Sequence, residues 1–254
     1  SSSSTSVFEG FSVNWYKVLF EDEAALQALK NTLVLAVCSS AISTVLGTAA
    51  AVGIDKYKSK YIRSGVMAVT NIPMMNPDIV TGISMMLLFV FFGRMLALRS
   101  SLSFITLLIA HVTFNLPYVI LSVLPKLKQT DANLHEAALD LGASPIYAFF
   151  KVVFPDIFPG VCSGFLLAFT MSLDDFVITH FTTGAGVHTL STKIYSEVRK
   201  GIKPEMYALS TLLFVTVLFL LVVVNVTPQE PKTKKTISKT RSQIRKIAGV
   251  TVRR

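Results

Sequence analysis

The chain has 254 residues, of which 52% are hydrophobic and only 15% are charged, and its mean hydropathy is +0.58. About a quarter of the residues are charged in a soluble domain, so this composition excludes an ordinary soluble protein and indicates an all-α protein that crosses a membrane several times. The formal charge of +9 does not indicate nucleic-acid binding, because a third or more of the Lys and Arg residues lie in the tail 228–254.

The sequence offers no motif for catalysis or for metal binding. Its two cysteines, Cys38 and Cys162, lie in apolar segments without a CxxC pair or histidines at metal-ligand spacing, and we interpret both as core residues. The G-x-x-x-x-G-K-[ST] motif of a P-loop is absent, as is any defensible Ser/His/Asp constellation. We therefore expect no metal and no cofactor, and a chain that is not an enzyme by itself.

Five segments are long and apolar enough to cross a bilayer, which takes about 20 helical residues. They are 32–54, 66–92, 102–124, 158–181 and 207–226. The basic linker 55–63 and the basic tail predict which side is cytoplasmic and outweigh the basic residues of 193–203 on the other side. The opening SSSSTSVFEG is neither a signal peptide nor a start, so we expect a sixth span before it in the intact protein.

These spans predict a simple domain organisation. Residues 1–30 form an extracytoplasmic segment with an amphipathic lead-in, and 31–227 form the transmembrane domain. A cytoplasmic loop, 125–157, lies within that domain. The tail 228–254 is expected in the cytoplasm, where its positive charge suits anionic lipid.

Two spans carry unusual polar positions. Pro73 and the run Asn76-Pro77-Asp78 interrupt the second span, which predicts two half-helices or a sharp kink, used either to line a cavity or only for packing. The third span carries a polar stripe on one helical face, for which we favour hydrogen bonds between helices over contact with a substrate. Its members are His111, Asn115, Tyr118 and Ser122.

The fourth span contains adjacent carboxylates, Asp174 and Asp175, which are costly in a bilayer. A helix that begins near Pro159 places Asp174 about 22 Å along its axis, in the outer part of the membrane. Neighbouring residues on a helix diverge by about 100°, so the two carboxylates share an environment only if the helix ends there. They either line a route for cations or pair with basic residues, such as Lys193 or Arg199 or those of a partner.

Two further acidic residues are weaker candidates for a pathway. Asp78 follows Pro77 at the break in the second span, where it either caps a half-helix or contacts cargo. Glu197 lies among basic residues and is interpreted as a solvated surface charge.

The loop 133–155, NLHEAALDLGASPIYAFFKVVFP, is predicted to form a helix-turn-helix outside the membrane. Asn133 caps the first helix and Gly142 ends it. Pro145 begins the second helix and Pro155 limits its far end. The apolar face of the first helix has no evident cover in this chain, which indicates either a partner protein or packing on the protein's own cytoplasmic ends.

This loop is similar to the EAA motif of ABC importer permeases in residue type and spacing. The match is carried by Glu136, Ala137, Ala138, Gly142, Val152, Phe154 and Pro155, with conservative Val and Phe where Ile and Leu are commoner. The resemblance implies that the loop forms the coupling helices, which dock into a groove of the ATP-binding subunit. The resemblance also implies the ATPase-coupling positions, which are Glu136, Ala137, Ala138, Gly142 and Pro155.

The resemblance covers nearly all of 11–227, and segments outside the loop make it more specific. The segments NWYKVLFEDEAALQALKNTL, MMNPDIVTGIS and SLDDFVITHFTTG resemble permeases of spermidine/putrescine importers. It implies the type I ABC importer permease fold in the cytoplasmic (inner) membrane. The implied partners are a second homologous permease, two ATP-binding subunits, an extracytoplasmic polyamine-binding protein and membrane lipid, and not nucleic acid.

We therefore expect the permease subunit of an ATP-driven importer that moves polyamines by alternating access, with Asp174, Asp175 and Asp78 on the substrate pathway. The alternatives are a permease for another small solute, such as thiamine or a metal, and a membrane scaffold that recruits a cytoplasmic partner. The choice between spermidine and putrescine is expected to be set by the binding protein.

Overall fold

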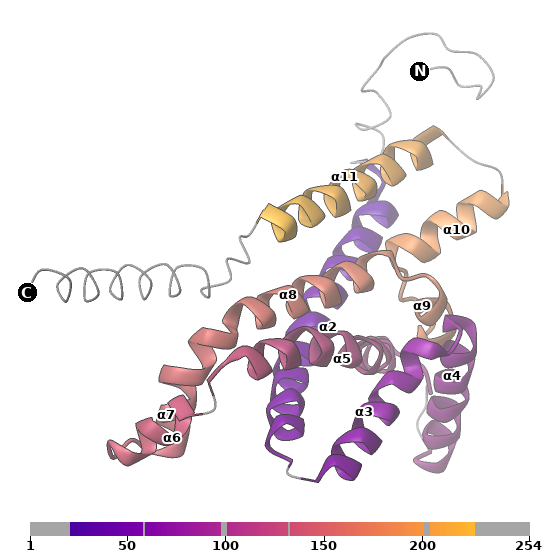
Figure 1. The fold of residues 1–254 in the computed structure, drawn as a ribbon. Coiled ribbons are helices and arrows are strands. Elements are labelled where there is room, and N and C mark those ends of the chain that lie inside the picture. The colour runs from indigo at the N-terminus through magenta and orange to yellow at the C-terminus, as the bar shows by residue number, and fades with distance from the viewer. Residues whose placement is uncertain (1–20, 58, 98–100, 132, 201–203, 227–254) are drawn as a thin grey trace, which may run out of the picture. The chain divides into compact units, whose positions relative to one another are not determined.

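The computed structural model describes residues 21–57, 59–97, 101–131, 133–200 and 204–226, and within these ranges all regular secondary structure is helical (Figure 1). The predicted tail 228–254 and most of the predicted segment 1–30 lie outside the described residues. The chain divides into two compact units, Ser1–Leu221 and Val222–Arg254, and every described helix except the end of α11 lies in the first.

The described helices follow one another with short connections. In chain order they are α2 (Glu23–Lys56), α3 (Lys60–Met75), α4 (Asp78–Met95), α5 (Phe104–Gln129), α6 (Asn133–Asp140), α7 (Pro145–Ala148), the π-helix η1 (Phe149–Val153), α8 (Phe154–Asp174), α9 (Val177–Thr182), α10 (Leu190–Lys200) and α11 (Pro204–Val226).

Four helical stretches of the described residues are long and apolar enough to cross a membrane: α2, α4, α5 and the continuous run Pro145–Asp174. Each corresponds to one of the first four predicted spans. The fifth corresponds to α11, whose shorter apolar part is Tyr207–Phe219. That last span therefore stays a prediction.

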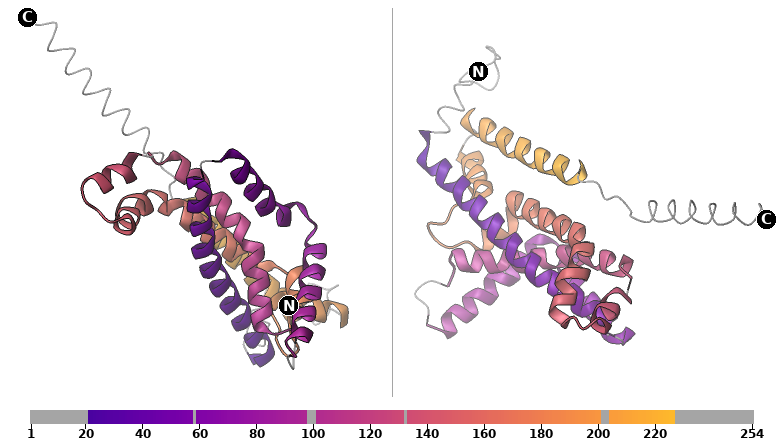
Figure 2. Two further views of the ribbon diagram at one scale, coloured as in Figure 1. Left: turned by 90° about the horizontal axis from the view of Figure 1, so that it is seen from below. Right: turned by 90° about the vertical axis from the view of Figure 1, so that its left-hand side faces the viewer.

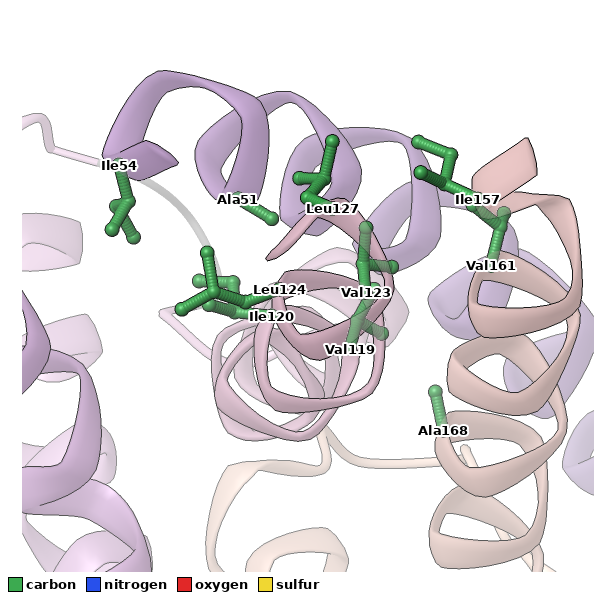
Figure 3. Close-up of a cluster of buried hydrophobic side chains, with 10 residues drawn as sticks. All are labelled: Ala51, Ile54, Val119, Ile120, Val123, Leu124, Leu127, Ile157, Val161 and Ala168. Carbon is green, nitrogen blue, oxygen red and sulfur yellow. The ribbon is translucent and has the colours of Figure 1, made fainter. Parts of the chain in front are cut away.

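The main core lies where α2, α5 and α8 pack together (Figures 1 and 2). Ten buried aliphatic side chains from these three helices fill it, among them Ile54, Ile120 and Ile157 (Figure 3). Small residues let the backbones approach closely, as is common between membrane helices. A Cβ atom on Gly47 would lie 2.7 Å from Val119, and one on Gly160 would lie 3.0 Å from the Ser122 carbonyl oxygen.

The predicted break in the second span is confirmed. Helix α3 ends at Met75, Asn76 is extended with φ −82° and ψ 143°, and α4 begins after Pro77. The predicted boundaries 66–92 were wrong, because α4 has 18 residues and thus a length of about 27 Å, close to the bilayer core by itself. Pro73 lies inside α3.

The predicted stop at Pro155 is wrong. Helix α7 continues through η1 into α8, so one helical run extends from Pro145 to Asp174 and does not begin near Pro159. A proline lacks the N–H that an α-helix requires at its interior positions. Here the wider π-turn at Phe149–Val153 directly precedes it, so Pro155 falls in the first turn of α8, where no such bond is required.

Helix α10 is bound to the start of α2 by three polar contacts. The Leu190 amide donates to Thr32 Oγ1 at 2.8 Å, and the Asn31 side-chain amide donates to the His188 carbonyl at 3.0 Å. Lys193 Nζ forms an ion pair with Asp22, the residue that caps α2. The segments Asp22–Thr32 and His188–Lys193 are thereby held side by side.

Candidate functional sites: the aspartate break and the helical hairpin

The helix of the fourth span ends at the aspartate pair. Helix α8 stops at Asp174, Asp175 is extended with φ −61° and ψ 125°, and the short helix α9 begins at Val177. The predicted span 158–181 is therefore interrupted after Asp174, and the possibility that the helix ends at the two carboxylates is confirmed. Non-helical backbone at membrane depth is tolerated where it is buried in protein or lines a cavity.

The carboxylate of Asp175 is bound by the first turn of α9. Its Oδ2 accepts hydrogen bonds from the Thr179 amide at 2.8 Å and from Thr179 Oγ1 at 3.0 Å, and its Oδ1 accepts from the Ile178 amide at 3.4 Å. These are amide donors that the start of a helix leaves without a helical partner. Asp175 thus supplies at this break what a capping residue supplies at a helix start.

The two aspartates differ in exposure. The Asp175 side chain is 9% exposed, whereas Asp174 is exposed. Neither forms an ion pair with Lys193 or Arg199 among the described residues, because Lys193 pairs with Asp22 and Arg199 lies 5.9 Å from the centre of the Tyr195 ring. The alternative that these two basic residues neutralise the pair is therefore wrong.

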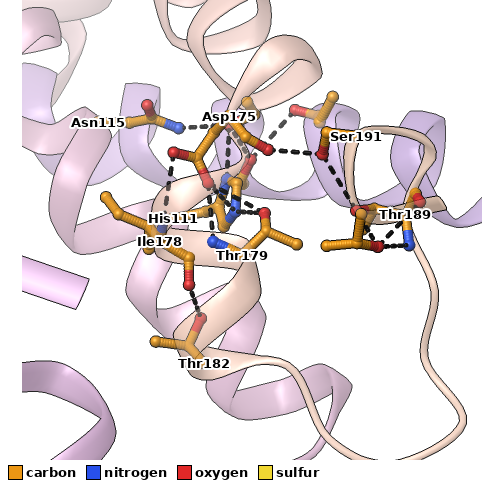
Figure 4. Close-up of polar contacts among 12 residues, drawn as sticks. His111, Asn115, Asp175, Ile178, Thr179, Thr182, Thr189 and Ser191 are labelled. Atoms are coloured by element: carbon orange, nitrogen blue, oxygen red, sulfur yellow. Dashed lines mark hydrogen bonds and ion pairs between the residues drawn. The ribbon is translucent and has the colours of Figure 1, made fainter. Parts of the chain in front are cut away.

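Buried polar side chains surround the break (Figure 4). His111 Nδ1 lies 3.2 Å from Ser172 Oγ, and His111 Nε2 lies 2.9 Å from Thr179 Oγ1. Asn115 Nδ2 donates to Ser172 Oγ at 2.7 Å, and Ser39 Oγ lies 2.9 Å from the same atom. His111 Nε2 is also 3.6 Å from Asp175 Oδ2.

These contacts confirm the preferred interpretation of the polar stripe for two of its members. His111 and Asn115 are fully buried and form hydrogen bonds to α8 and α9. Ser122 instead donates to the Tyr118 carbonyl of its own helix at 2.9 Å. The stripe is therefore a helix-helix contact at its first two positions.

Asp78 lies on a helix that contacts the break. It is exposed, in the first turn of α4, where a negative charge is favoured by the helix dipole. One turn later, Gly82 packs on α9: a Cβ there would lie 3.0 Å from the Phe181 ring and 3.5 Å from the Val177 carbonyl oxygen. The structure thus brings the start of α4 close to the segment that follows Asp175.

The loop after α5 forms the predicted hairpin of two helices, α6 and α7. Gly142 has φ +87° and ends α6, with its amide bound to the Leu139 carbonyl at 2.9 Å, as predicted for a C-terminal glycine. Asn133 is already the first residue of α6, and Asp131 Oδ1 accepts from its amide at 3.0 Å, so the predicted capping role of Asn133 belongs to Asp131.

The outer surface of this hairpin is apolar and exposed. Leu141 is 89% exposed and Ile146 is 73% exposed, and Glu136 and Ala137 are also exposed, whereas Ala138 is half-buried. Helix α6 packs on η1 and on α7 of its own chain. Pro155 is exposed but lies in α8, beyond the hairpin.

Sequence reasoning missed the partners that complete the buried site. Ser39, Ser172 and Thr179 lie on three different helices, and a single serine or threonine in an apolar helix gives little signal, because its hydroxyl can bond to its own backbone. Thr179 alone was open to prediction, because it follows Asp175 by four residues at the start of a helix.

Solved structures share this fold. The chain matches a bacterial ABC transporter that imports the acidic polysaccharide alginate, with a TM-score of 0.70, 17% sequence identity and coverage of 87% of this chain and 86% of that one. It also matches the MetNI methionine ABC transporter in an inward-facing conformation, with a TM-score of 0.62, 18% identity and coverage of 85% and 96%. The helices and the hairpin thus define a membrane subunit with the fold of an ABC importer permease.

Sequence comparison defines the family. Residues 43–235 match the binding-protein-dependent transport system inner membrane component model. The putrescine transport system permease protein PotI of Escherichia coli K12 is 38% identical over 213 residues, which cover 84% of this chain and 76% of PotI. The spermidine/putrescine transport system permease protein PotC of the same strain is 39% identical over 217 residues, which cover 85% and 79%. The chain therefore belongs to the family of binding-protein-dependent transport system inner membrane components.

Proposed function

We propose that this chain is the permease subunit of an importer for polyamines. The observation that carries the proposal is the exposed carboxylate of Asp174 at the helix break that ends a membrane-spanning helix, in a chain whose relatives include putrescine and spermidine/putrescine permeases. A polyamine is a flexible cation with several charges. A carboxylate on a water-filled route lowers the electrostatic barrier for such a cation, and the passing cation offsets the cost of holding the carboxylate there.

In this proposal the three aspartates contribute differently to the pathway. Asp174 contacts the cargo directly, because it is the exposed member of the pair. Asp175 adds negative charge from its mostly buried position next to Asp174. Asp78 adds negative charge from the start of α4, which packs on α9. Together they give the route a negative potential that suits a polycation and disfavours an anion.

The hairpin is proposed to couple movement of the ATP-binding subunits to movement of the membrane spans. Its exposed apolar residues, with Glu136, Ala137, Ala138 and Gly142, dock on one of two separate ATP-binding subunits, and Pro155 holds the start of α8 beside them. A second homologous permease completes the pathway, and an extracytoplasmic polyamine-binding protein delivers cargo. Closure of the ATPase pair then rocks the spans between outward-open and inward-open states. In this orientation the hairpin, the linker 55–63 and the tail face the cytoplasm.

Uptake of labelled spermidine and putrescine by membrane vesicles that contain the full complex tests the proposal. Asp174→Asn is expected to reduce uptake about tenfold or more, since one carboxylate near a cation contributes about 1 to 4 kcal/mol between water and a protein surface. Glu23→Gln is the matched control, because Glu23 is an exposed carboxylate in the first turn of α2.

The amount of assembled complex must be the same for each variant. Unchanged polyamine uptake in both Asp174→Asn and Asp78→Asn would contradict the carboxylate route. Uptake of thiamine or a metal in place of polyamines would assign the chain to another cargo. Failure of an ATP-binding subunit to co-purify would support a scaffold.

A further inference from the structure

The buried polar network at the break connects four helices through one path of hydrogen bonds. Ser39 lies on α2, His111 on α5, Ser172 on α8 and Thr179 on α9, and each has 2% or less of its surface exposed. Asn115, also on α5, joins at Ser172. Buried polar side chains in a membrane protein depend on partners within the protein, and of the network atoms Asn115 Oδ1 is the one without such a partner among the described residues.

With Thr179 Oγ1 as the donor to Asp175, the donors and acceptors of this path can be assigned in order. Thr179 Oγ1 donates its only hydrogen to Asp175 Oδ2, so it accepts from His111 Nε2 at 2.9 Å, and that nitrogen carries a proton. Nδ1 of the neutral imidazole is then an acceptor, which Ser172 Oγ satisfies as the donor at 3.2 Å.

The same order satisfies the other contacts of Ser172. With its hydrogen given to His111, its oxygen accepts from Asn115 Nδ2 at 2.7 Å and from Ser39 Oγ at 2.9 Å, which also lies 3.3 Å from the Ala36 carbonyl oxygen. A hydroxyl has one donor and two acceptor sites, so all three are used.

We propose that His111 and Asp175 are positioning residues for the cargo carboxylate of Asp174. His111 fixes Thr179, Thr179 and the start of α9 fix Asp175, and Asp175 fixes the extended backbone that ends α8 and leaves Asp174 exposed. The inference rests on the proposed function for the role of Asp174. The geometry of the break itself does not depend on the identity of the cargo.

Two substitutions of His111 test its two hydrogen bonds, to Thr179 and to Ser172, separately. The side-chain nitrogen of Gln reaches about as far as Nε2 of histidine, so His111→Gln keeps a donor toward Thr179. The side-chain oxygen of Asn lies near the position of Nδ1, so His111→Asn keeps an acceptor for Ser172 and loses the bond to Thr179. Both variants are polar and smaller than histidine, which matches them as a pair.

The first readout needs no cargo. In a variant with Cys38 and Cys162 replaced by serine, Asp174→Cys is labelled by a positively charged, membrane-impermeant thiol reagent in the assembled complex. His111→Asn is expected to change the labelling rate about tenfold, the effect of a net hydrogen bond of ordinary strength. His111→Gln is expected to leave the rate close to that of the parent. Equal rates in the parent and in both variants would overturn the inference.

The second readout is uptake by the chain with Asp174 intact. His111→Asn is expected to raise the spermidine concentration that gives half-maximal uptake by about the same factor. His111→Gln is expected to leave that concentration close to the value of the parent. Equal loss in both variants would show that His111 serves packing alone and would overturn the positioning role. If labelling follows the expected pattern while Asp174→Asn leaves polyamine uptake unchanged, the positioning of residue 174 stands and the proposed cargo route fails.

Discussion

The aspartate break and the α6–α7 hairpin are both connections between helices, but they treat their side chains in opposite ways. At the break, His111, Ser172 and Thr179 are buried, and their hydrogen bonds are made within one chain. At the hairpin, Leu141 and Ile146 are more than 70% exposed. Buried backbone and polar groups in a membrane protein have no water to bind, so they bind one another. The apolar residues of the hairpin are exposed to solvent, and no described part of this chain covers them.

This comparison distinguishes contacts that one chain completes by itself from a surface that it leaves free for another protein. The break needs no second protein to satisfy Asp175, so its geometry is set when this subunit folds. The hairpin has a defined backbone, with Gly142 at φ +87°, and presents an apolar surface on one side. Such a surface is typical of a protein-protein contact. The following predictions test this division.

The largest effect is expected at the hairpin. Gly142→Asp places a charged side chain at the end of α6, beside the exposed Leu141, and is expected to abolish ATP-driven uptake while membrane insertion is unchanged. Gly142→Asn is the control, because Asn also tolerates positive φ but adds no charge. Glu136→Lys, on the same helix, is expected to act like Gly142→Asp. Normal ATP-driven uptake in either charged variant would argue against a coupling role for the hairpin.

A smaller effect, on stability, is expected at the break. Ser172→Ala removes the atom that Ser39, His111 and Asn115 share. Each buried polar group left without a partner costs about 1 to 3 kcal/mol, so the free energy of unfolding in detergent is expected to fall by at least that amount. Ser163→Ala is the control, because Ser163 bonds only to the Pro159 carbonyl of its own helix, at 2.9 Å. Equal stability of the two variants would show that the network adds nothing beyond packing.

The smallest effect is expected at the ion pair between Asp22 and Lys193. Burial by itself raises the pKa of Asp22, but hydrogen bonds from Lys193 and from the Ala25 and Ala24 amides outweigh it and lower the pKa below the ordinary value of 3.8. A lowered folded-state pKa stabilises the fold at pH values above the unfolded-state pKa, and this contribution is lost as the pH falls through the folded-state pKa. Because the Asp22 side chain is 30% exposed, we expect about 0.2 to 1 kcal/mol at neutral pH.

Asp22→Asn checks this prediction, because Asn also caps helices well and the substitution removes mainly the charge. The variant and the parent are expected to differ slightly in melting temperature at neutral pH and to converge in strong acid. A difference that persists in strong acid would have to come from the cap and not from the ion pair.

Features that depend on local sequence were predicted well. The break at Asn76-Pro77 and the end of α6 at Gly142 follow from the backbone limits of proline and glycine, which act within a few residues. Hydropathy located the four long apolar helices of the described residues. Their ends were less accurate, because helix continues beyond the apolar part of a span in both α2 and α5.

Features that depend on tertiary packing were not predicted. Pro155 does not end its helix, because the π-turn at Phe149–Val153 accommodates it, and no local rule places such a turn. The different surroundings of Asp174 and Asp175 were not predicted, because Asp175 lies beside His111, which is distant in sequence. Which polar atoms meet is decided by how α5, α8 and α9 pack.

The helical run Pro145–Asp174 has a mechanical consequence for transport. It comprises 30 residues, so it is about 45 Å long at the rise of an α-helix. Its first residue belongs to the hairpin and its last is the exposed aspartate of the break. A continuous helix bends little along its length, so displacement of the hairpin by a docked protein moves the opposite end of the same rod. The π-turn, which directly follows α7, and Pro159 inside α8 are the points at which that rod is able to flex.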